Sequence, residues 1–125
     1  MIEIDSDEYN ILHEAEEDGY LSFWLLIYYI SQWNPELNIY QVYSRTYKKL
    51  EKLIEAGYIE IVEVHWQEKE GIWEDVYSEV VPFNMVKEVL NKPTTWDRTV
   101  SNSDSNYQLC ITELGSKAMD LYEKI

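Results

Sequence analysis

The chain has 125 residues, 46% of them hydrophobic, and its 24 acidic and 10 basic residues give a formal net charge of −14. This length and apolar content predict one folded domain over residues 1–125 rather than a disordered chain, and the longest apolar run, 23–30, is far shorter than the roughly 20 residues that span a membrane. The charge disfavours nucleic acid and anionic membranes as partners unless a local basic surface exists, and the N-terminus lacks the pattern of a secretory signal, so we expect a cytoplasmic protein.

Three helices are expected in the N-terminal half. Asp5 and Glu8 have the spacing of a capping box at the start of a helix over 6–17, which Gly19 ends. The segment 23–33 is apolar on nearly every side and predicts a buried helix. From 38 to 56 the apolar residues recur every three or four positions, which indicates a long amphipathic helix.

A small antiparallel sheet is expected after these helices. Residues 58–66 and 76–81 read as two strands, joined by an exposed, charged tip at 67–75 that contains Gly71. An insertion over about 82–105 would hold a short helix at 83–90 and a polar loop at 94–106. A returning strand at 107–111 and a final helix capped by Thr112 complete the expected α+β fold.

Two stretches carry a resemblance to a known superfamily: 50–60 (LEKLIEAGYIE) and 109–115 (LCITELG), supported by Gly19-Tyr20-Leu21-Ser22. Together they resemble a winged helix-turn-helix, in which a recognition helix runs into a β wing and a strand then turns into the last helix. This resemblance implies three N-terminal helices, a small antiparallel wing and a C-terminal helix. It implies no single function, because such folds serve DNA binding, protein binding and dimerisation.

The exposed face of the helix at 38–56 is the basic exception in this acidic chain. Four of the ten basic residues lie there, and we single out the polar and basic set Gln41, Ser44, Arg45, Lys48, Lys49 and Lys52. These side chains would contact phosphates and base edges if the helix reads DNA. The alternative is a solvated face whose cations are paired with nearby carboxylates.

The aromatic residues favour a protein partner. The chain has 5 Trp and 11 Tyr, more than a small core easily encloses, and we single out Trp73 and Trp96 as aromatic contacts. For Trp96, burial beneath the insertion is the competing interpretation. The acidic tip, with Glu68, Glu70 and Glu74, is also poorly suited to gripping a phosphate backbone.

The sequence contains no motif for catalysis or for a cofactor. The single cysteine, Cys110, lies in a predicted strand and is expected to be a small buried hydrophobe rather than a nucleophile. His13 and His65 lie in different predicted elements without another His or Cys at ligand spacing, so we expect no metal site. The glycines are isolated and form no phosphate-binding loop.

These observations predict a non-catalytic winged-helix module that binds a protein partner, with a basic protein as one candidate, as a regulator, an immunity-like inhibitor or a nucleic-acid mimic. The alternative is a transcriptional regulator that reads DNA through the helix at 38–56, as a homodimer paired through its terminal helices. The deciding question is whether Arg45, Lys48, Lys49 and Lys52 are free or neutralised by their neighbours.

Overall fold

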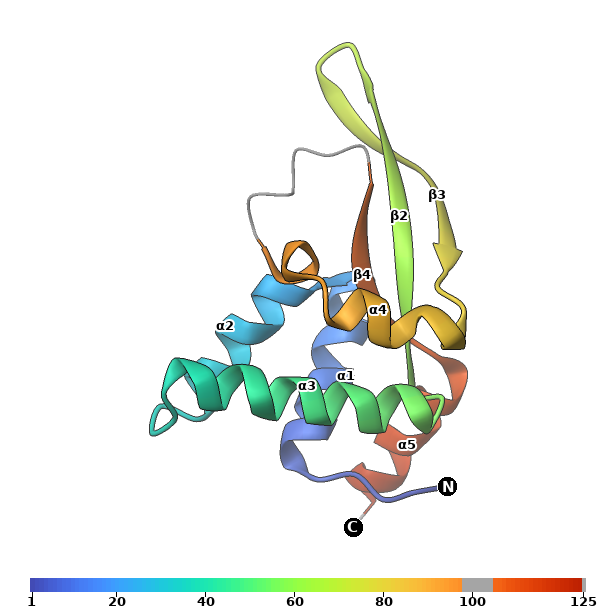
Figure 1. Ribbon diagram of the computed structural model, residues 1–125. Helices are drawn as coiled ribbons and strands as arrows, with labels where there is room; N and C mark the ends of the chain where they lie inside the picture. The colour runs from blue at the N-terminus through green and yellow to red at the C-terminus, as the bar shows by residue number, and fades with distance from the viewer. Residues whose placement is uncertain (98–104, 125) are drawn as a thin grey trace.

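Figure 1 shows the computed structural model of the protein, which describes residues 1–97 and 105–124, without the side chains of Trp73, Asp75, Val76 and Ser105. Within this part of the chain, five α-helices and a four-stranded antiparallel sheet confirm the α+β class predicted from the sequence. The elements follow one another as α1 (Ser6–Asp18), β1 (Leu21–Ser22), α2 (Phe23–Trp33), α3 (Ile39–Glu55), β2 (Ile59–Lys69), β3 (Ile72–Val80), η1 (Phe83–Met85), α4 (Val86–Leu90), η2 (Pro93–Trp96), β4 (Ser105–Ile111) and α5 (Glu113–Glu123). No helix in the described ranges is long and apolar enough to cross a membrane.

The helix boundaries follow from local capping. Asp5 accepts a hydrogen bond from the backbone N–H of Glu8, and the Glu8 carboxylate accepts one from the Asp5 N–H, at 2.8 and 2.9 Å. Asn38 and Gln41 form the same reciprocal pair at the start of α3, with both bonds 2.9 Å long. Each box satisfies two backbone N–H groups that have no partner within the helix.

The sheet has the strand order β1-β4-β2-β3, with every neighbouring pair antiparallel. Strand β4 therefore lies between β1 and β2, although β3 and the insertion separate β4 from β2 in the chain. In Figure 1 the β2–β3 hairpin projects beyond the helices. This arrangement is compatible with a winged helix that carries the short helices η1, α4 and η2 between its hairpin and its last strand.

The prediction that the hairpin tip spans 67–75 is wrong, because most of those residues belong to strands β2 and β3. The turn consists only of Glu70 and Gly71, with φ of 56° and 81°. Positive φ at both central positions is the requirement of a type I′ turn, whose twist suits long hairpin strands. Glu68, Lys69 and Glu74 are strand residues exposed to water, because the hairpin extends past the core.

The predicted boundaries of the polar loop, 94–106, are wrong at both ends. Residues 93–96 form the 3₁₀ turn η2, and strand β4 already begins at Ser105. Asp97 follows η2, and the rest of that loop, 98–104, lies outside the described ranges.

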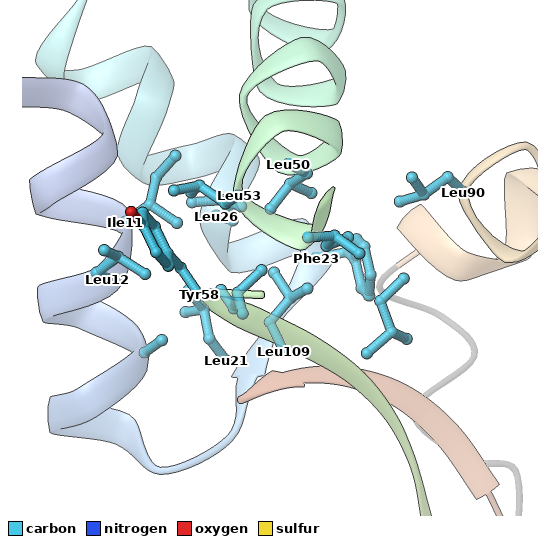
Figure 2. Close-up of a cluster of buried hydrophobic side chains, with 14 of the residues drawn as sticks. Ile11, Leu12, Leu21, Phe23, Leu26, Leu50, Leu53, Tyr58, Leu90 and Leu109 are labelled. Atoms are coloured by element: carbon cyan, nitrogen blue, oxygen red, sulfur yellow. The ribbon is translucent and has the colours of Figure 1, made fainter. Parts of the chain in front are cut away.

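The core gathers apolar side chains from α1, α2, α3, α4 and β4 around Tyr58, as Figure 2 shows. Tyr58 is 1% exposed, and its hydroxyl donates to the carbonyl of Ile2 at 2.7 Å, which ties the N-terminal segment to the domain. Val89 and Leu90 of α4 belong to the same cluster. The insertion is thus part of the core, where each fully buried aliphatic side chain contributes about 1.5–3 kcal/mol.

The two stretches that resemble the winged-helix pattern contact each other at a corner of the domain. Thr112 donates its backbone N–H to the Tyr58 carbonyl at 3.1 Å and its hydroxyl to the Gly57 carbonyl at 2.6 Å. The same hydroxyl accepts the N–H of Gly115 at 3.0 Å and so caps α5. A Cβ at Gly115 would lie 2.1 Å from the Tyr58 carbonyl oxygen, so this close approach of two backbones requires glycine.

We expect Gly115→Ala to destabilise the protein by about 2–4 kcal/mol, because the clash is with backbone that cannot rotate away. The measurement is the free energy of unfolding from a urea titration followed by circular dichroism. Lys117→Ala, on an exposed position of the same helix, is the matched control and should change stability by less than about 0.5 kcal/mol. Equal stability of the two variants would show that the corner does not restrain the fold.

Candidate interaction site

The six polar and basic residues singled out on α3 all line one open groove of about 660 Å³. The groove is lined by Glu8, Leu37, Tyr40, Gln41, Ser44, Arg45, Lys48, Lys49 and Lys52. The long helix places these residues together because its opposite face, with Val42, Leu50 and Leu53, is buried in the core. Glu8 is the acidic member of this lining, and it comes from α1.

Glu8 joins α1 to α3 through two lysines. Its side chain is 1% exposed; Oε1 accepts from Lys52 Nζ at 2.8 Å and Oε2 accepts from Lys49 Nζ at 3.4 Å. Lys49 also donates to the Asp5 carboxylate. One buried carboxylate therefore serves both the capping box of α1 and the contact between the two helices.

Arg45 is also engaged with neighbouring residues. Its Nη1 donates to the Asn34 side-chain oxygen at 2.9 Å and lies 3.8 Å from the Asp7 carboxylate. The Asn34 amide in turn donates to the Ile30 carbonyl at 3.1 Å. The end of α2 thus holds the guanidinium beside the first turn of α1, so three of the four cations on this face have acidic partners.

The pairing shifts the pKa values of Asp5 and Lys49 in opposite directions. Burial alone would raise the pKa of Asp5, but the hydrogen bonds from Lys49 and from the Glu8 N–H lower it below its usual 3.8. Burial alone would lower the pKa of Lys49, but the bond to Asp5 and the charge of Glu8 raise it above 10.5. The Asp5 contribution to stability is therefore complete above pH 3.8 and is lost as pH falls through its folded-state pKa, whereas the Lys49 contribution persists up to pH 10.5 and is lost above it.

The remaining candidates on α3 differ in what they offer to a partner. The Gln41 side chain accepts the Asn38 N–H in the capping box, so its carbonyl oxygen is already occupied. Ser44 and Lys48 are exposed, and the described residues provide no ion pair to Lys48. Lys48 is thus the cation of this set that remains fully available.

Trp96 does not stand out into solvent. Its ring is partly buried, packs edge-on against Phe23 at 5.0 Å and Tyr43 at 5.9 Å, and its Nε1 donates to the Leu90 carbonyl at 2.9 Å. It nevertheless forms one wall of a second open groove, of about 620 Å³, together with Trp24, Tyr43, Pro93 and Asp97. The side chain of Trp73 lies outside the described part of the chain; its backbone pairs with Glu68 across the hairpin.

The spacing of Asp5 and Glu8 in the sequence predicts only a helix cap. No pattern in the chain indicates that Glu8 also contacts two lysines more than forty residues away. The apolar segment 23–33 predicts a buried helix, yet Trp24 within it is 36% exposed, and Tyr43 on α3 is 40% exposed.

Cys110 has the chemistry of a structural thiol. Burial, helped by the charge of Glu60, raises its pKa to about 11, and its Sγ contacts the Gly19 carbonyl at 3.4 Å. At neutral pH the group is protonated, and the thiol is a poor nucleophile compared with the thiolate.

Comparison of the chain with protein-family models, with curated proteins and with solved structures found no match.

We expect Glu8→Gln to lower the free energy of unfolding by about 1–3 kcal/mol, because it removes a buried negative charge from between Lys49 and Lys52. The glutamine oxygen can still accept the Asp5 N–H, so the loss reports the interhelical charges rather than the cap. The measurement is a chemical denaturation curve at pH 7. Glu17→Gln, on an exposed position of the same helix, is the control, and a loss as large as that of Glu8→Gln would contradict the bridging role.

Proposed function

We propose that the protein is a non-catalytic winged-helix module that binds a protein partner with a basic surface. The observation that carries the proposal is that acidic residues at the start of α1 pair with basic residues of α3. Arg45, Lys49 and Lys52 are paired with Asp7, Asp5 and Glu8, respectively. The basic face that would attract phosphates is largely neutralised within the domain. A chain of net charge −14 then presents a negative field, which favours encounter with a cationic protein.

The groove bounded by Trp24, Tyr43 and Trp96 is the contact surface that we assign to this partner. Three aromatic rings supply faces that attract a lysine or arginine side chain, and the carboxylate of Asp97 lies in the same lining. Rigid aromatic side chains of this kind provide much of the binding energy in protein interfaces.

The acidic hairpin supports the same proposal. Glu68, Glu70 and Glu74 are exposed near its tip, together with Lys69. A wing of this charge repels a phosphate backbone and attracts a basic surface. A regulator, an immunity-like inhibitor and a nucleic-acid mimic all fit this description.

The test is capture of a partner from native lysate with the immobilised protein, followed by identification and purification of what is retained. We expect a basic protein that binds at low salt, dissociates as salt is raised because the attraction is screened, and loses at least about tenfold in affinity with Trp24→Ala. Leu121→Ala, which removes an exposed apolar side chain from α5, is the control and should bind normally. A retained protein that is acidic, insensitive to salt or indifferent to Trp24→Ala would contradict the proposal, as would the absence of any retained protein.

DNA binding through α3 is the second candidate, favoured by Lys48 and by the convergence of all six predicted residues on one groove. If α1 masks this face, the double variant Asp5→Asn, Asp7→Asn should bind duplex DNA several-fold more tightly than the wild type at about 50 mM salt, where phosphate attraction is strong. Asparagine also caps helices, so α1 should remain intact.

The measurement is fluorescence anisotropy with a labelled duplex of random sequence, and with duplexes selected from a genomic library. The wild type should show no binding tighter than about 1 µM, the strong end of non-specific affinity. Tighter binding by the wild type, abolished by Arg45→Ala with Lys48→Ala, would establish the DNA-reading alternative instead.

A further inference from the structure

Three potential metal ligands meet on the β2–β3 hairpin, away from both grooves. Glu63, His65 and Glu79 each offer one ligand atom, and these atoms all lie within 4.8 Å of one another. We propose that these three residues bind a divalent transition-metal ion that bridges the two strands. This inference is independent of the proposed function.

The sheet geometry brings the three side chains together. Glu63 and His65 are two residues apart on β2 and therefore point to the same face. Glu79 is directly opposite Glu63 in the register of β2 and β3, and Tyr77 is directly opposite His65. The His65 ring is held by stacking on the Tyr77 ring, with centroids 4.2 Å apart and planes 13° from parallel.

Two features of this cluster are compatible with a bound cation. Glu63 and Glu79 face each other across the strands, and like charges in directly opposed positions destabilise a sheet. His65 Nε2 exposes less than 1 Å² and has no hydrogen-bond partner, although it lies 3.5 Å from Glu63 Oε1. A buried ring nitrogen without a partner is energetically costly, and one cation between the three side chains would offset both features.

The donor set indicates the class of ion. One imidazole nitrogen and two carboxylate oxygens suit Zn²⁺ and its first-row neighbours rather than Ca²⁺, which prefers six or more oxygen ligands. Bonds of about 2.0–2.2 Å place ligand atoms about 3.4 Å apart in a tetrahedral site, so the side chains must move inward by roughly 1 Å. Glu79 is exposed and can make this movement. Three protein ligands leave one position for water or another donor.

No spacing in the sequence predicts this site, because no other His or Cys lies near His65 in the chain and its two acidic partners come from different strands. A metal ion at His65 would overturn the expectation from the sequence that neither histidine belongs to a metal site. The three side chains are brought together by the register of the β2–β3 hairpin, which depends on the turn at Glu70 and Gly71.

The test is calorimetric titration of ZnCl₂ into the full chain after chelator treatment, at pH 7.5 in a buffer that does not bind zinc. We expect one ion per chain, and a loss of at least about tenfold in affinity with His65→Ala or with Glu79→Gln. Glu79 is exposed, so Glu79→Gln tests the site even if His65→Ala unfolds. In parallel, histidine ring ¹⁵N spectra should show a large change at His65 Nε2 on adding zinc.

His13→Ala is the matched control, because His13 is 3.9 Å from Glu17 and is the other histidine that has a carboxylate neighbour. It should leave zinc affinity unchanged. Absence of a one-to-one binding event, equal affinity in wild type and Glu79→Gln, loss of binding with His13→Ala, or an unchanged His65 spectrum would each overturn the metal site. An imidazolium signature at His65 without zinc uptake would assign the positive charge to a proton instead.

Discussion

The contact on which the arrangement depends is the Glu8 carboxylate, buried between the first turn of α1 and the exposed face of α3. It accepts the N–H that starts one helix and the ammonium groups of Lys49 and Lys52 on another, so a local cap is also a long-range link. A carboxylate that is 1% exposed is tolerated only because its oxygens are satisfied by charged donors. This contact fixes how α1 lies on α3, and hence which charges of α3 remain available to a partner.

The consequence is a separation of charge that composition alone does not describe. Acids at the start of α1 pair with cations of α3, whereas Glu68, Glu70 and Glu74 on the hairpin are exposed, and Lys48 has no ion-pair partner among the described residues. The aromatic groove between α2, α3 and η2 is the surface that we assign to the proposed protein partner, and its Trp96 ring is held by packing against Phe23. Pre-ordered aromatic side chains lose little conformational entropy on binding.

The short helices between β3 and β4 set the order of the strands in the sheet. Strand β3 pairs on the outer side of β2, and the chain must cross back through η1, α4 and η2 before β4 can take its place between β1 and β2. Val89 and Leu90 bury themselves on that path, so the crossing helices close one side of the core. On β2, Glu63 and His65 alternate with the buried Val62 and Val64 and so lie on the opposite face of the sheet, which Glu79 shares from β3.

By itself, the sequence determined the helices, because caps and apolar periodicity are local: α1, α2 and α3 begin and end within about a residue of the expected positions. It also determined the α+β class and the set of residues on the face of α3. The hairpin was less predictable, since exposed strands and loops have similar composition and only the two positive φ values at Glu70 and Gly71 distinguish them. Tertiary structure alone decided whether the cations of α3 were paired, which aromatic rings bordered a groove, and which acids faced His65. Each of these depends on residues far apart in the chain, whose proximity is set by packing and strand register rather than by sequence spacing.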